Sequence, residues 1–270
     1  MNKQPLDGQN AMTIYLGNNW VLVASIPGDY QLSEALAPSF VASTDPDFKI
    51  RANSSNVIQH ESYLLRYGEF SAACGKDLFY LYVDPVAPVG LAIQSVTTAA
   101  VEPCKAVLTS KACQLICNTS GLAHNEPRLG DVQVGVESLL SSLSAQLHAT
   151  SPDGFVQEVA NFLKEPGKLA YKWSDIGLNF GISPDYLRQQ FSRNSGITLS
   201  GYRYWLRFRL AIEFASETKA TKRPLSITEL ALAAGFYDAA HCARFVRKSL
   251  GQSLSSMMTT QANFVDCRTG

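Results

Sequence analysis

The sequence has little that would mark a secreted or membrane-bound protein. No stretch approaches the roughly 18 consecutive apolar residues that a membrane-spanning helix needs. Residues 1–10 hold a single basic side chain and no apolar core, so no secretory signal is expected. The 6 cysteines include no CxxC pair, which favours free thiols in a reducing compartment. We therefore expect a cytoplasmic protein with no membrane partner.

Motifs of catalysis are also absent. The 4 histidines are too far apart in sequence to indicate a metal site, and His60-Glu61 is an isolated pair. The sequence contains no phosphate-binding loop, no nucleophile elbow and no dinucleotide-binding glycine motif. We expect no enzyme activity, no metal and no cofactor. The sequence leaves open whether a small-molecule effector exists and does not indicate its identity.

The net charge of zero hides a difference between the two halves. Residues 1–150 hold 8 Lys and Arg against 13 Asp and Glu, a balance of −5, whereas residues 151–270 hold 15 against 10, a balance of +5. Such asymmetry favours a polyanionic partner for the basic half, although a difference of this size also arises by chance. The length suits two domains.

Residues 12–120 consist mainly of short apolar runs separated by Pro, Gly and Asp. Trp20–Ile26, Leu78–Val83 and Leu91–Thr98 are rich in β-branched and aromatic residues, which predicts strands of a β-rich domain. The pattern of Val107–Cys117 fits no single element.

Apolar residues then recur with helical spacing at Val132, Val136, Leu139, Leu140, Leu143 and Leu147. This stripe either packs against the β domain or forms a homodimer interface through residues 132–147. The turn-rich segment Thr150–Gly154 follows. We place the boundary between domains 1–150 and 151–270 there.

The pattern from residue 155 onward is helical throughout. Ser183-Pro184 provides an N-cap followed by proline at the first helical position, and Gly196 and Gly251 stand where left-handed residues end helices. Residues 226–229 match a capping box. Helices are predicted at about 154–164, 173–180, 183–194, 198–217, 226–234, 238–250 and 253–261.

This helical region repeats itself. A short helix meets Gly181 in one unit and Gly235 in the other, and a second, capped helix follows each glycine. A tight glycine turn between two short helices is typical of a helix-turn-helix. The units cover about 173–194 and 226–250.

The second helix of each unit has an apolar inner face and a polar outer face. Arginine can read guanine and glutamine can read adenine in the major groove of double-stranded DNA, and an alanine can contact a thymine methyl group. The alternative for one such face is simple solvation, but two at matching positions favour DNA. The candidate DNA-binding residues are Asp185, Arg188, Gln189, Ser192 and Arg193 in the first unit, and Ala239, Ala240, His241, Arg244, Arg247 and Lys248 in the second.

The helix predicted at 198–217 connects the two units. A helix of 20 residues spans about 30 Å, close to the roughly 34 Å between successive major-groove faces on one side of DNA. It could therefore place both second helices in adjacent grooves. Arg203 and Arg207 on this helix either reach phosphate or form internal contacts.

The C-terminal region resembles the AraC/XylS family of bacterial transcription regulators over residues 155–258. The second unit carries Ile227, Leu230-Ala231, Gly235-Phe236, Asp238, His241, Arg244, Arg247-Lys248 and Gly251 at the family spacing. The first unit agrees at Ile176, Ser183-Pro184, Tyr186-Leu187, Phe191, Gly196, Tyr202, Arg207 and Ala211.

The resemblance implies an α+β multidomain protein. An N-terminal cupin-like β domain with helices would sense a signal or dimerise, and an all-α domain of seven helices with two helix-turn-helix units would follow. It implies an activator with RNA polymerase as a partner. The sequence departs from the family pattern at Gln189, Cys242, Val246, Leu254 and Met257.

Two alternatives concern how such a regulator is controlled. Cys113 and Cys117 lie four residues apart and could form a redox or metal switch, although buried structural thiols are the more common case. The other alternative is control by a partner protein without a small ligand.

Overall fold

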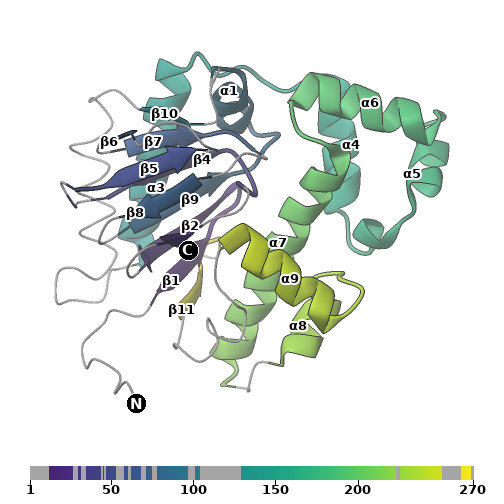
Figure 1. The fold of residues 1–270 in the computed structure, drawn as a ribbon. Coiled ribbons are helices and arrows are strands. Elements are labelled where there is room, and N and C mark those ends of the chain that lie inside the picture. Colours follow the sequence, from purple (N-terminus) through teal and green to yellow (C-terminus); the bar gives the residue numbers. More distant parts are fainter. Residues whose placement is uncertain are drawn as a thin grey trace.

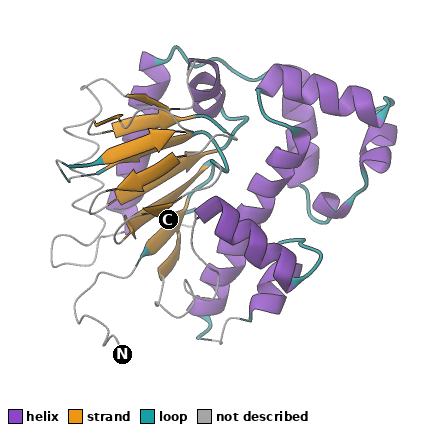
Figure 2. Cartoon of the chain, viewed as in Figure 1, coloured by secondary structure: helices purple, strands orange, loops and turns teal. Residues whose placement is uncertain are grey.

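The computed structural model arranges the chain as a β-sheet half and a helical half that lie against each other (Figures 1 and 2). It describes residues 12–26, 30–31, 35–43, 45, 47–52, 58–59, 62–67, 71–74, 78–96, 101–103, 129–222, 226–250 and 263–268. The expectations for Val107–Cys117, for the two cysteines within it and for a helix at 253–261 lie outside these residues.

The β half contains a larger and a smaller sheet. The seven-stranded sheet has the order β10-β7-β4-β9-β2-β1-β11, and the four-stranded sheet has the order β3-β8-β5-β6. All pairs are antiparallel except β1 with β11. The strands are β1 (Thr13–Leu16), β2 (Trp20–Ile26), β3 (Tyr30–Gln31), β4 (Ser39–Ala42), β5 (Lys49–Ala52), β6 (Ile58–Gln59), β7 (Ser62–Leu65), β8 (Ser71–Cys74), β9 (Leu78–Val83), β10 (Val101–Pro103) and β11 (Asn263–Asp266).

Helix α3 (Leu129–Gln146) covers one face of the larger sheet. Its stripe residues Val132, Val136, Leu139 and Leu143 are buried in one cluster with strand residues of that face. The apolar stripe predicted from the sequence therefore packs within the chain. The outer surface of α3, which is mostly polar and includes the 66% exposed Val134, is the part of this helix that remains available to another molecule.

The expectation of a strand at Leu91–Thr98 is wrong. Residues Pro88–Val96 form helix α1. Pro88 occupies the first helical position, where proline needs no hydrogen-bond partner, and Val89 and Ile93 pack one turn apart into the core beneath α3. A short apolar run fits a strand and a buried helix equally well, and here the helical spacing decided.

The helical half follows the predicted boundaries within a few residues. Ser183 caps α6 with Pro184 at its start, and Gly196 ends it with a left-handed φ of 69°. The predicted fold class is confirmed, with one addition, because strand β11 returns to the sheet after the last described helix. The elements are α4 (Gly154–Lys164), the 3-10 helix η2 (Lys168–Ala170), α5 (Trp173–Asn179), α6 (Pro184–Ser195), α7 (Leu199–Ala220), α8 (Ile227–Ala233) and α9 (Ala239–Leu250).

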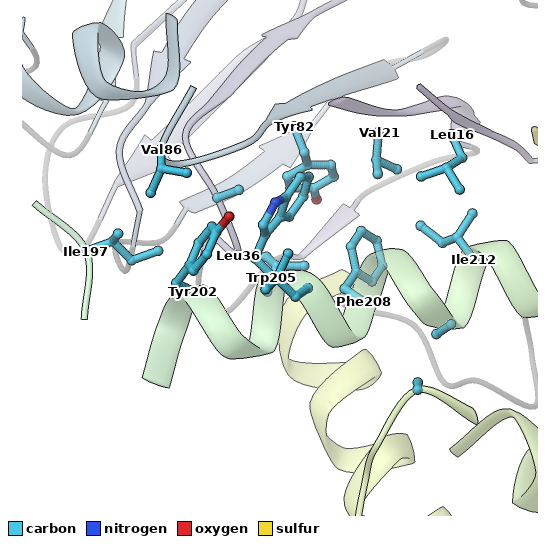
Figure 3. Close-up of a cluster of buried hydrophobic side chains, with 14 of the residues drawn as sticks. Leu16, Val21, Leu36, Tyr82, Val86, Ile197, Tyr202, Trp205, Phe208 and Ile212 are labelled. Carbon is cyan, nitrogen blue, oxygen red and sulfur yellow. The ribbon is translucent and has the colours of Figure 1, made fainter. Parts of the chain in front are cut away.

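Helix α7 joins the two halves in one hydrophobic core. Tyr202, Trp205 and Phe208 project from α7 toward strand residues of the larger sheet (Figure 3). The rings of Phe208 and Tyr82 meet edge to face with centroids 6.1 Å apart. Tyr202 and Trp205 have no exposed surface, so the sheet excludes water from this side of α7.

We expect Trp205→Ala to destabilise the whole chain by about 3–5 kcal/mol, since it leaves a large cavity in the shared core. Urea unfolding followed by circular dichroism should show both halves lost in one transition. Tyr237→Ala is the control, because that side chain is 88% exposed and its loss should change stability by no more than about 0.5 kcal/mol. A helical half that stays folded while the sheet unfolds would contradict the shared core.

Candidate nucleic-acid interface

The two predicted units share one turn geometry. The Ile182 N–H donates to the Gly177 carbonyl and the Phe236 N–H donates to the Ala231 carbonyl, both at 2.9 Å. Gly181 and Gly235 hold φ angles of 65° and 73°, a left-handed conformation that favours glycine. The sequence repeat is therefore a structural repeat.

The space inside the first turn explains its second glycine. A Cβ atom on Gly177 would lie 2.6 Å from the carbonyl oxygen of Ile182. Ala231 occupies the matching place in the second unit. The first unit thus requires glycine at this place, whereas the second unit carries alanine there.

Side-chain caps start both second helices. Ser183 accepts a hydrogen bond from the Tyr186 N–H at 3.2 Å, and Asp238 accepts one from the His241 N–H at 2.6 Å. Each cap satisfies a backbone donor that the first turn leaves free. The local sequence therefore fixes where α6 and α9 begin.

Helix α6 separates a buried face from a polar one. Leu187 and Phe191 are fully buried, and the ring of Phe191 lies 5.5 Å from that of Tyr202 on α7. On the other side Asp185, Arg188, Gln189 and Arg193 are exposed, and Ser192 is half-buried. Asp185 forms an ion pair with Arg188, which holds the guanidinium along the exposed face.

Helix α9 has the same division. Cys242 and Val246 are buried, and burial raises the pKa of the Cys242 thiol to about 11. Ala240, Arg244 and Arg247 are exposed, and Ala239 is half-buried. The backbone of Lys248 lies on this helix, but its side chain is outside the described part of the chain.

His241 differs from its neighbours on α9. Its ring lies 5.3 Å from that of Phe236, and Nε2 is 3.4 Å from the Tyr204 hydroxyl. The side chain is half-buried. These contacts direct the imidazole toward α7, so its structural role is visible while a base contact stays a prediction.

Arg203 and Arg207 on α7 each attach one unit. The Arg203 guanidinium stacks 3.4 Å above the Trp173 ring and donates to the Tyr171 carbonyl at 2.9 Å. Arg207 lies 5.7 Å from the Phe236 ring centroid. Burial, with Arg207 nearby, lowers the pKa of Arg203 to about 10. Both guanidinium groups make internal contacts.

Sequence reasoning missed a second pair of matched positions. Leu178 and Leu232 stand three residues before the turn glycines and are 81% and 61% exposed. Tyr186 and Tyr237 are also exposed, near the starts of α6 and α9. Aligning the two units on Gly181 and Gly235 would have shown that both carry leucine at this position. Their exposure is visible only in the structure.

In the described part of the chain, no cluster of three or more His, Cys, Asp or Glu side chains could hold a metal ion. Nor does any helix there combine the length and apolar character needed to cross a membrane.

Comparisons with known proteins agree with this geometry. Residues 178–260 match the model of a helix-turn-helix domain family. No curated protein matches the chain. Among solved structures, an apo single-residue variant of ToxT from Vibrio cholerae strain SCE256 covers 90% of this chain and 98% of its own, with a TM-score of 0.57 and 10% identity.

Two ligand-bound structures are similar in the same way. Wild-type ToxT with an unsaturated fatty acid has a TM-score of 0.53 at 10% identity and covers 91% of this chain and 98% of its own. ToxT from Vibrio cholerae O395 with (E)-4-(8-methylnaphthalen-1-yl)but-3-enoic acid has a TM-score of 0.54 at 11% identity, with coverages of 92% and 98%. At such identities the likeness concerns the fold.

A matched pair of helix-turn-helix units on a shared helix defines a DNA-binding transcriptional regulator and not an enzyme. The domain is of the AraC type, so the resemblance to AraC/XylS regulators is confirmed.

Two arginine variants separate internal from external roles. We expect Arg207→Met to lower the free energy of unfolding by about 1–3 kcal/mol, because it removes partly buried stacking on aromatic rings. Arg247→Met, at an exposed position, should change it by no more than about 0.5 kcal/mol. Urea denaturation measures both. Equal losses would mean that Arg207 does not hold the second unit.

Proposed function

We propose that this protein is a cytoplasmic, sequence-specific activator that reads two adjacent major-groove segments with one chain. The observation that carries the proposal is the repeat of one turn geometry with Arg188, Gln189 and Arg244 on exposed helix faces. Arginine and glutamine have the hydrogen-bonding geometry for guanine and adenine. The sites would be asymmetric, since the two helices present different side chains, and would lie near promoters, where RNA polymerase is the partner.

The spacing of the two units along DNA depends on more than the length of α7. Its 22 residues span about 33 Å. The second unit folds back beside α7, however, where the Tyr204 and Phe245 rings stack with centroids 5.2 Å apart. The spacing between α6 and α9 therefore follows from both the helix and this aromatic contact.

Charge supports the same proposal. The excess of basic residues lies after residue 150, and Arg193, Arg244 and Arg247 are exposed. Contacts from such side chains to phosphate release counterions, so affinity should fall steeply as salt rises. Phosphate contacts would fix the register, and base contacts would supply specificity.

Single substitutions on either recognition helix test this reading. We expect Arg188→Ala or Arg244→Ala to weaken binding to the specific site by about 1–3 kcal/mol through loss of base contacts. Binding to random duplex should change much less. The specific site comes from selection out of a random duplex pool, and fluorescence anisotropy at one salt concentration gives both affinities. Equal losses on both duplexes would show that the side chains touch only phosphate.

The N-terminal half would control DNA binding through its contacts with the helical half. Gln94 on α1 donates to the Gly196 carbonyl at the end of α6, at 3.0 Å. The Lys164 Nζ atom on α4 lies 3.0 Å from a carboxylate oxygen of buried Asp84. A homodimer through residues 132–147 would use the polar outer face of α3, because its apolar stripe is buried.

The effector that we propose is an apolar carboxylic acid. ToxT, which shares the fold, is seen with an unsaturated fatty acid and with a naphthalenyl butenoic acid. In the described part of this chain, the hydroxyls of Tyr82 and Tyr202 and the Trp205 Nε1 are buried without a hydrogen-bond partner. Burial raises the pKa of both phenols, which keeps them protonated. All three are hydrogen-bond donors from which a carboxylate could accept.

A ligand series tests this effector class. We expect a cis-unsaturated fatty acid to raise the melting temperature, whereas the alcohol of the same chain length should not. Tyr202→Phe should weaken the shift, since it removes one donor and keeps the ring. Without ligand this variant should be as stable as the wild type, because the hydroxyl it removes has no partner. Equal shifts with acid and alcohol would point to nonspecific apolar binding.

A further inference from the structure

Strand β11 carries the chain from the second helix-turn-helix unit back to the N-terminal sheet. It pairs in parallel with β1, Thr13 opposite Asn263 through Leu16 opposite Asp266. The Asn263 N–H donates to the Met12 carbonyl at 2.9 Å, and the Cys267 N–H donates to the Leu16 carbonyl at 2.8 Å. A strand from the far end of the chain thus covers the exposed edge of β1.

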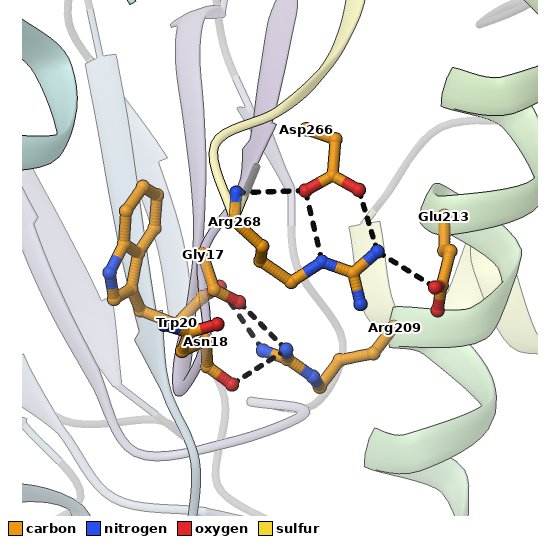
Figure 4. A network of polar contacts seen from close by, with 7 residues as sticks. All are labelled: Gly17, Asn18, Trp20, Arg209, Glu213, Asp266 and Arg268. Atoms are coloured by element: carbon orange, nitrogen blue, oxygen red, sulfur yellow. Dashed lines mark hydrogen bonds and ion pairs between the residues drawn. The ribbon is translucent and has the colours of Figure 1, made fainter. Parts of the chain in front are cut away.

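The same strand is bound to α7. The Arg268 guanidinium donates to a carboxylate oxygen of Glu213 at 2.7 Å and also pairs with Asp266 (Figure 4). Lys219, near the end of α7, donates to the side-chain oxygen of Asn263. Strand β11 therefore bridges the sheet edge and the C-terminal part of α7.

This bridge lies where α7 has few large apolar anchors. Its N-terminal part buries Tyr202, Trp205 and Phe208. Beyond Ile212 the buried residues are the small Ala215 and Thr218, and the one large apolar side chain packed on the core, Phe214, is only partly buried. Apolar burial scales with the area removed from water, so the last turns gain less from the sheet than the first. The polar contacts to β11 act on these last turns.

A second polar contact holds α7 just before that part. Arg209 donates to the carbonyl oxygens of Gly17 and Asn18, both at 2.7 Å, and to that of Trp20 at 3.2 Å. Gly17 and Asn18 lie in the turn between β1 and β2 and Trp20 begins β2, next to the strand that β11 covers (Figure 4). Polar contacts thus join one edge of the sheet to α7 at Arg209, Glu213 and Lys219.

We propose that β11 is a C-terminal latch that positions the second helix-turn-helix unit for DNA. With β11 paired to β1, the last turns of α7 are fixed to the sheet, and α8, which follows them, starts from a fixed point. The latched state leaves Arg188, Arg244 and Arg247 exposed, so it does not cover these side chains. The latch preorganises the pair of units and lowers the entropy lost on binding a site that needs both. This inference rests on the proposed function.

Latch and DNA must then affect each other equally. If closing the latch strengthens operator binding by some factor, the operator must favour the closed latch by the same factor. Removing β11 should therefore weaken binding to a complete operator, whereas binding through phosphate alone should be unaffected.

The first test removes the strand. The full chain selects an operator from a random duplex pool, and anisotropy then measures its affinity for that operator and for a scrambled duplex. A chain ending at residue 262 should bind the operator about 10-fold more weakly and the scrambled duplex equally well. A chain ending at residue 268 is the matched control. If the shorter chain does not fold, the variant Arg268→Gln, which keeps the strand, is used instead. We expect it to lose less operator affinity than the shorter chain.

The second test reads the latch itself. In Arg268→Gln, amide hydrogen exchange should be faster in residues 213–220, with or without DNA. In the unaltered chain, the operator should slow exchange at Asn263 and Cys267. Operator affinity unchanged in folded latch variants, or unchanged exchange in residues 213–220, would overturn the latch. A full chain that enriches no sequence would instead overturn the proposed function, and exchange in residues 213–220 would still decide whether β11 holds α7.

Discussion

The packing of helix α7 against the N-terminal sheet sets the positions of both helix-turn-helix units. Tyr202 and Trp205 lose all contact with water there, and Phe208 packs against Tyr82. A helix with this many aromatic side chains could not stay exposed, since their transfer from water supplies most of the favourable free energy of packing. One face of the sheet therefore completes the hydrophobic core of the helical half.

Because one side of α7 faces the sheet, its other sides carry the two helix-turn-helix units. Arg203 attaches the first through Trp173, and Arg207 attaches the second through Phe236. A planar guanidinium suits this role, because it can stack on a ring and donate hydrogen bonds at its edge. One helix thus joins the sheet and the two helix-turn-helix units, and a shift of the sheet would reach α6 and α9 through it.

Local signals predicted the helical half well. Ser183, Pro184 and the left-handed Gly196 fixed the limits of α6, and the repeated turn around Gly181 and Gly235 identified the fold of each unit. The exposed faces of α6 and α9 were also foreseen, with His241 turned inward instead. Predictions were weaker in the β half, where a short apolar run at residues 91–98 suited either a strand or the helix that formed. Strand β11 had no local signal strong enough to be noticed, because its partner β1 lies at the other end of the chain.

Local sequence was enough to predict the caps, the glycine turns and the apolar faces of the helix-turn-helix units, because each depends on residues within one or two helical turns. Three features follow instead from long-range packing: the stripe of α3 is buried, Arg203 and Arg207 face inward, and strand β11 covers the edge of the N-terminal sheet. These outcomes depend on contacts between residues far apart along the chain, and no local pattern records which distant surface will exclude water from a given side chain.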